Sequence, residues 1–167
     1  MMPELNFLNP ELIQIDAEAD DKEGIIKKLA NLLISKGYAK ESYLEAILER
    51  EKVFPTGLPT EGVGVAIPHA DIKHVIKPAI AVAILKHPVQ FNVMGNPEEK
   101  VSVKIIFMLA ITDPNIQLKL LQDLMEIFQN KQLLLKLAVS RDVDTVLKLM
   151  TLKENYNTEQ IDVAGNY

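Results

Sequence analysis

Apolar residues recur along the chain at the spacings typical of helices and of buried strands. One helical face, with members three or four residues apart, is formed by Ile25, Ile26, Leu29, Leu32 and Leu33. Similar spacing, together with polar residues able to cap helix starts, predicts five helices, at about Asp21–Ser35, Glu41–Phe54, Asn115–Gln129, Lys131–Val139 and Val143–Leu152.

Shorter apolar segments predict strands at Leu12–Ile15, Val63–Ile67, Ala79–Leu85 and Val101–Ala110. The last two are apolar on both faces, so they need cover on both sides of a sheet. Between them, His87–Glu99 contains prolines and a glycine and predicts only a short strand and a turn. Turn-forming residues also crowd Pro55–Gly64, which predicts a loop.

Strands mixed with helices predict an α/β fold. We expect a single-domain three-layer sandwich over residues 1–152, a mixed β-sheet flanked by helices on both faces, followed by a loose tail at 153–167. The chain has 167 residues, which is the usual size of one domain.

Composition excludes several classes of function. With 18 Lys and Arg against 23 Asp and Glu, the net charge is −5, and an acidic chain with 5% aromatic residues is poorly suited to nucleic acid. The absence of cysteine excludes disulfide scaffolds, thiolate zinc sites and cysteine nucleophiles. No apolar run approaches the ~20 residues that span a bilayer, and the N-terminus has no signal-peptide pattern. We therefore expect a cytoplasmic protein without membrane insertion and without a cofactor.

His69 is the leading candidate for chemistry. It follows the predicted strand at Val63–Ile67, and Pro68 is expected to end strand pairing and turn the ring outward. Functional sites collect at strand ends in α/β sheets, where histidine serves as base, metal ligand or nitrogen nucleophile. An ordinary loop histidine is the alternative.

The neighbours of His69 allow a metal site. The spacing His69-x-Asp71-x-x-His74 resembles that of metal ligands, although no obvious further ligand lies nearby. A metal-dependent hydrolase is therefore one alternative function. His74 alone is either a surface residue or a hydrogen-bonding neighbour of the site.

Arg50 precedes the predicted loop, and Thr56 lies within it. The sequence Glu49-Arg50-Glu51 is compatible with an ordinary ion pair on a solvated helix face. Alternatively, the Arg50 guanidinium reaches His69, where it can hold two phosphate oxygens at once, and Thr56 adds a hydroxyl.

Three segments carry a family resemblance when taken together: Glu49-Arg50-Glu51-Lys52, Pro55-Thr56-Gly57 and Gly64-Val65-Ala66-Ile67-Pro68-His69. In residues, order and gaps they resemble the EIIA component of the phosphoenolpyruvate-dependent sugar phosphotransferase system (PTS), in its fructose/mannitol superfamily. The galactitol-type branch is the most similar.

The resemblance implies a phosphoryl relay. His69 would be phosphorylated by the phosphocarrier HPr and would pass the group to a cysteine of an EIIB partner, which serves the membrane permease EIIC. Arg50 would supply charge and Thr56 a hydrogen bond. A regulatory module that signals through the same phosphohistidine, as in nitrogen-type relatives, is the alternative.

Two positions depart from the mannitol-type pattern. Ala70 replaces a glycine after the active histidine, and Gln117 stands where mannitol-type members carry a second histidine. Gln117 can donate a hydrogen bond but carries no charge, so we expect His74 to take over part of that role.

Overall fold

Polar side chains cap the helices in the computed structural model, which describes residues 7–151. Asp21, Asp113, Asn130 and Asp142 each accept a hydrogen bond from a backbone N–H of the first helical turn. The helices are α1 (Lys22–Ser35), α2 (Tyr43–Val53), α3 (Pro114–Phe128), α4 (Lys131–Ala138) and α5 (Val143–Thr151). None of the described helices is long and apolar enough to span a membrane. The tail predicted at 153–167 lies outside the described residues.

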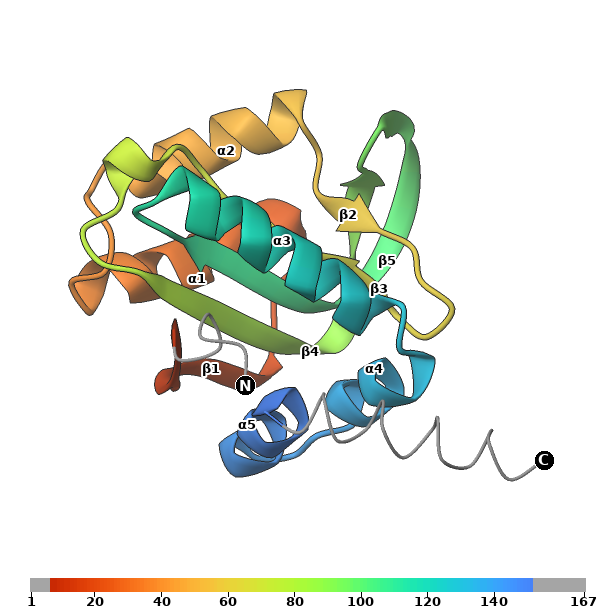
Figure 1. Cartoon of the computed structure of the whole chain (residues 1–167). Coiled ribbons are helices and arrows are strands. Elements are labelled where there is room, and N and C mark those ends of the chain that lie inside the picture. Colours follow the sequence, from red (N-terminus) through yellow and green to blue (C-terminus); the bar gives the residue numbers. More distant parts are fainter. Residues whose placement is uncertain (1–6, 152–167) are drawn as a thin grey trace.

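Five strands form one mixed sheet (Figure 1). They are β1 (Leu8–Ala17), β2 (Gly57–Leu58), β3 (Gly64–Ala66), β4 (Ala79–Val93) and β5 (Asn96–Ala110). β4 pairs parallel to β1 and antiparallel to β5, and β5 pairs parallel to β3. The short β2 pairs antiparallel to β3 and meets the end of β4, where Gly57 lies opposite Val93.

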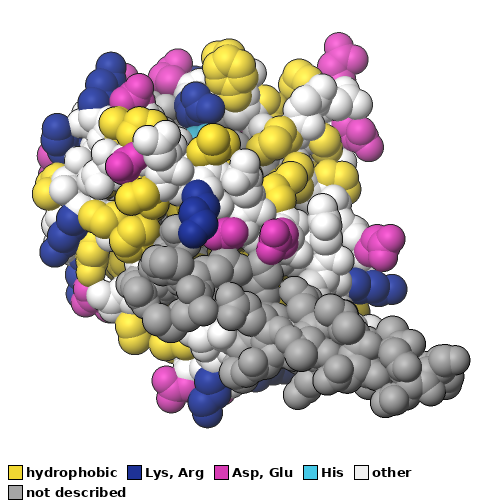
Figure 2. Space-filling view, in the orientation of Figure 1, with side chains coloured by type: hydrophobic (Ala, Val, Ile, Leu, Met, Phe, Trp, Pro, Cys, Tyr) yellow, Lys and Arg dark blue, Asp and Glu magenta, His cyan; other side chains and the backbone are white. Residues whose placement is uncertain are grey.

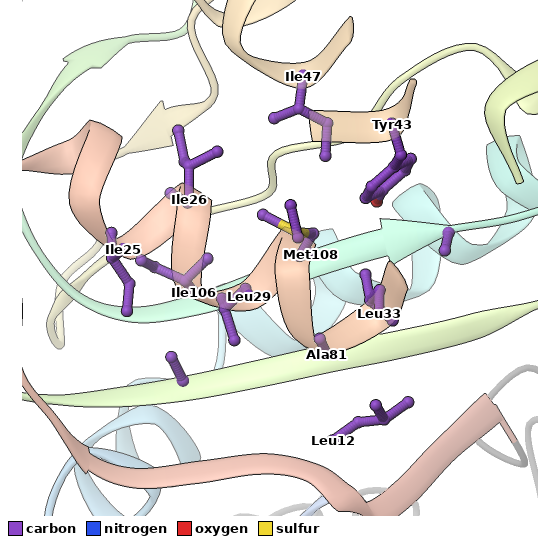
Figure 3. Packing of buried hydrophobic residues seen from close by; sticks show 14 of the residues in the cluster. Leu12, Ile25, Ile26, Leu29, Leu33, Tyr43, Ile47, Ala81, Ile106 and Met108 are labelled. Atoms are coloured by element: carbon purple, nitrogen blue, oxygen red, sulfur yellow. The ribbon is translucent and has the colours of Figure 1, made fainter. Parts of the chain in front are cut away.

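Side chains alternate between the two faces of the sheet and build two cores. On β5, Ile106 and Met108 belong to the core beneath α1 and α2, and Figure 3 shows Ile25 and Leu29 around them. Phe107 and Leu109 belong to the opposite core, beneath α3, α4 and α5. The predicted single-domain three-layer α/β fold is therefore confirmed.

The hairpin between β4 and β5 is longer than the sequence predicted. Instead of a short strand and a turn over His87–Glu99, β4 continues to Val93 and β5 begins at Asn96. Pro88 is tolerated because the β4–β5 register shifts between Ile84 and Val89, where a missing N–H costs no ladder bond. Gly95, with φ of 79°, supplies the left-handed turn.

The segment predicted as a loop, Pro55–Gly64, contains β2 and leads directly into β3. Glycine is required at both strands by close packing against the long hairpin. A Cβ on Gly57 would lie 2.6 Å from the Asn92 carbonyl oxygen, and one on Gly64 would lie 2.1 Å from that of Ser102. This packing holds the residues before His69 against β4 and β5.

Candidate functional site

His69 lies just beyond β3 and remains attached to the sheet. Pro68 does not end the pairing as expected: its carbonyl accepts a hydrogen bond of 3.0 Å from the Leu109 N–H, and His69 forms a parallel bridge with Leu109. Instead of turning out into solvent, the residue is only 8% exposed. It lines a cavity of about 350 Å³ between the end of α2, the segment that follows β3, and α3.

The His69 ring is held in one tautomer. Its Nδ1 lies 2.8 Å from the carbonyl oxygen of Ile67. Because a carbonyl can only accept, the hydrogen of the neutral ring must be on Nδ1, which leaves a lone pair on Nε2. The sequence could not reveal this contact, since it depends on how the chain bends at Pro68.

Burial keeps the His69 ring neutral. Removal from water lowers the pKa of His69 below its ordinary value of 6.5, and the charge of Arg50 lowers it further, while the bond to Ile67 opposes both effects. A neutral histidine with a free nitrogen lone pair is a nucleophile or a general base at neutral pH.

The imidazole of His69 should titrate below pH 6.5 in the folded protein. Because burial disfavours the charged ring, it should protonate at a lower pH than a solvent-exposed imidazole does. An NMR titration of the ring would measure this midpoint. The denatured chain in urea is the control, with an expected midpoint near ~6.5. A folded-state midpoint at or above that of the control would contradict the prediction.

Arg50 brings the positive charge to the cavity. It lies in the last turn of α2, exposed at the cavity wall, with its guanidinium carbon 5.2 Å from the centre of the Phe54 ring. The sequence also allowed an ordinary ion pair of Arg50 on the helix surface. In the structure Glu49 pairs with Lys52 at 3.3 Å and not with Arg50. No salt bridge joins Arg50 to another residue within 7–151. Its charge is therefore available to an anion in the cavity.

Thr56 lines the same cavity, but its hydroxyl hydrogen is directed elsewhere. The side chain of Glu51 accepts hydrogen bonds from the Thr56 hydroxyl at 2.9 and 3.2 Å, and from the Thr56 backbone N–H at 2.9 Å. Glu51 is only 4% exposed, so it does not lie on the solvated face expected from Glu49-Arg50-Glu51. Sequence reasoning missed this residue. The only available signal was a carboxylate five residues before a threonine.

Helix α3 closes the other side of the cavity with Leu121 and Met125. Gln117 is four residues before Leu121, so it lies on the same helix face, one turn nearer the start of α3. Its side-chain oxygen is buried and has no hydrogen-bond partner among the described residues. Gln117 thus lies one helical turn from the cavity-lining Leu121, with an unused acceptor.

The structure does not gather His69, Asp71 and His74 into a metal site. Asp71 Oδ1 accepts from the backbone N–H of Lys73 at 3.0 Å, and His74 Nδ1 lies 2.8 Å from the hydroxyl of Ser42. Within the described part of the chain, no three His, Cys, Asp or Glu side chains come together as metal ligands. His74 therefore lies at the start of α2, whereas Arg50 is at its end, and the expected contact from His74 toward His69 is not formed.

A protein-family model matches nearly the whole chain. The model described as "Phosphoenolpyruvate-dependent sugar phosphotransferase system, EIIA 2" matches residues 6–153. The chain belongs to this EIIA family. The recognition made from three short motifs is therefore confirmed over nearly the whole chain.

Relatives of this EIIA domain include a regulator and a transport component. The transcriptional regulator ManR of Bacillus subtilis is 35% identical over 145 residues, which are 86% of this chain and 21% of ManR. The chain thus spans about a fifth of that relative. The galactitol-specific EIIA component of Escherichia coli K12 is 29% identical over 102 residues, covering 61% of this chain and 67% of that protein.

A solved structure has the same fold. The crystal structure of IIA mannitol from Escherichia coli superposes with a TM-score of 0.71 at 24% identity, over 84% of this chain and 96% of that one. The arrangement of sheet and helices is therefore that of a known PTS IIA protein.

Proposed function

We propose that this EIIA domain carries a phosphoryl group on Nε2 of His69, accepting it from phospho-HPr and passing it to an EIIB cysteine in a sugar or polyol uptake system. The observation that carries the proposal is a buried, neutral His69 whose tautomer leaves Nε2 free, in a cavity that also holds Arg50. Thr56 lines this cavity, Gln117 lies one helical turn before Leu121, which also lines it, and both residues would complete the site.

The chemistry requires no metal ligand from this chain. The Nε2 lone pair forms a bond to phosphorus as the bond to the donor breaks, and the donor keeps that electron pair. In the second transfer, a cysteine sulfur bonds the phosphorus and the Nε2–P electrons return to the ring. Arg50 would neutralise the negative charge on the phosphoryl oxygens. Stabilising this charge is a main source of catalysis in such transfers.

The side chains around the cavity suit transient docking. Val53 and Phe54 are 66% and 60% exposed, and Leu118 and Met125 on α3 also expose apolar surface. Figure 2 shows a small histidine surface beside a Lys or Arg side chain, with hydrophobic side chains nearby. Because one histidine cannot meet two partners at once, HPr and EIIB would use the same face in turn, through small and short-lived interfaces.

We further propose that the system is of the galactitol type. Gln117 replaces the second histidine of the mannitol-type pattern, which favours this branch. The selectivity for the sugar would belong to the membrane partner, because nothing in the relay requires EIIA to touch the sugar.

The direct test is reconstitution with phosphoenolpyruvate, Enzyme I and HPr. We expect label on the EIIA domain that is stable in base and labile in acid, as for a nitrogen-linked phosphoryl group, and that is discharged by added EIIB. The matched control omits HPr and should give no label. Absence of labelling in the complete mixture would overturn the proposal.

A regulatory role is the second candidate, because ManR, a transcriptional regulator, is 35% identical over 86% of this chain. The same phosphohistidine would then act as a signal. The two roles are separated by the second half-reaction. Efficient discharge to EIIB favours transport, whereas a label that persists with EIIB present favours regulation.

A further inference from the structure

Glu51 is an unusual residue to find in the interior of this domain. It lies in the last turns of α2, it is 4% exposed, and burial raises its pKa. Burying a carboxylate costs free energy unless it is well hydrogen-bonded. Its carboxylate accepts hydrogen bonds from the backbone N–H and the hydroxyl of Thr56, so its bonding is concentrated on one residue.

The hydrogen bonds continue from Thr56 to His69. The carbonyl of Thr56 accepts from the Ile67 N–H at 3.3 Å. The carbonyl of Ile67 in turn accepts from His69 Nδ1 at 2.8 Å. Hydrogen bonds therefore connect Glu51 to Nδ1 of His69, the ring nitrogen that fixes the tautomer. The chain of bonds runs through Thr56, which precedes β2, and Ile67, which follows β3.

The hydrogen bonds between Glu51 and Thr56 also restrain Phe54, the residue on which Arg50 stacks. Only Phe54 and Pro55 lie between the end of α2 and Thr56, and Phe54 is the residue on which the Arg50 guanidinium stacks. Holding Thr56 against Glu51 thus restrains this short connection. A single carboxylate would restrain both the nucleophile and the cation.

We propose that Glu51 is a positioning residue for phosphoryl transfer: by holding Thr56 and, through it, Ile67, it keeps His69 in the Nδ1–H tautomer with Nε2 facing the cavity. This inference rests on the proposed function of His69 as phosphoryl carrier. Glu51 acts through the positions of its oxygen atoms, since Thr56 needs acceptors there, and its negative charge is secondary.

Two substitutions separate the position of the acceptor from its charge. Glu51→Gln keeps an acceptor oxygen at nearly the same place and loses the charge, whereas Glu51→Asp keeps the charge and withdraws the oxygens by one methylene. We expect E51Q to retain the wild-type tautomer and a labelling rate within about threefold of wild type. We expect E51D to populate the other tautomer and to label at least tenfold more slowly, because misplacing reacting groups by about 1 Å costs up to 10²-fold.

The tautomer is read from the ¹⁵N shifts of the His69 ring in the free protein, and the rate from labelling by phospho-HPr. The E51D loss should appear in the maximal rate and leave the dependence on HPr concentration unchanged. Glu49→Gln and Glu49→Asp, at an exposed glutamate paired with Lys52, are the matched controls and should resemble wild type. Circular dichroism verifies folding.

The outcomes decide between the hypotheses. Wild-type tautomer and rate in E51D, or equal damage in E51Q and E51D, would overturn the role of Glu51. If E51D does not fold, E51Q alone still tests the inference, because a large change in its tautomer would contradict it. If the wild-type protein takes no label, the proposed function fails. The tautomer measurements would still test whether Glu51 positions the His69 ring.

Discussion

Replacing His69 with alanine should abolish phosphorylation of the domain completely. No other residue should take the label, because the cavity holds no second neutral nitrogen nucleophile among its lining residues. Phosphosite mapping of the wild-type protein should place the phosphoryl group on Nε2, since Nδ1 is occupied by its hydrogen bond to Ile67. His74→Gln is the matched control and should be labelled as fast as wild type, because His74 bonds Ser42 away from the cavity.

The domain should survive the loss of His69. The substitution leaves the Ile67 carbonyl without its side-chain partner, which should reduce the free energy of unfolding by about 1–3 kcal/mol. Chemical denaturation would measure this change. Normal labelling of the folded alanine variant, or a phosphoryl group mapped to Nδ1, would contradict the assignment.

Replacing Arg50 with alanine should slow phosphoryl transfer by about 10²–10³-fold, the cost of losing one preorganised group that stabilises the transition-state charge. Arg50→Lys should recover only part of the rate, because a point charge does not reproduce the two parallel hydrogen bonds of a guanidinium. Rapid-quench measurement of labelling by phospho-HPr would give both rates.

The stability of the Arg50 variants should change little. Arg50 is exposed and its guanidinium stacks on Phe54, so the free energy of unfolding should fall by less than about 1 kcal/mol. Lys52→Ala, two residues along on the same helix and also exposed, is the matched control and should transfer at the wild-type rate. Equal rates for wild type and Arg50→Lys would show that Arg50 does not clamp phosphate.

The fold was largely predictable from the sequence because its signals are local or periodic. The helices follow from apolar spacing and from caps such as Asp21 and Asn130, which act within one turn. Ala79–Leu85 and Val101–Ala110 are apolar on both faces, which required a covered sheet. The sequence did not predict that the hairpin extends to Val93 and Asn96. Pro88 lies within His87–Glu99 and suggested a turn, but a register shift between β4 and β5 accommodates it inside a strand.

The site was only partly predictable. By itself, the sequence determined a strand-end histidine, a nearby arginine and the family that combines them, because those residues lie within one continuous segment. Tertiary structure alone decided what each group does: it buried Glu51 against Thr56, paired His74 with Ser42, and placed Leu121 and Met125 of α3 over the cavity. It also decided the tautomer of His69, since a hydrogen bond between Nδ1 and the Ile67 carbonyl depends on the bend of the backbone, which no spacing of residues encodes.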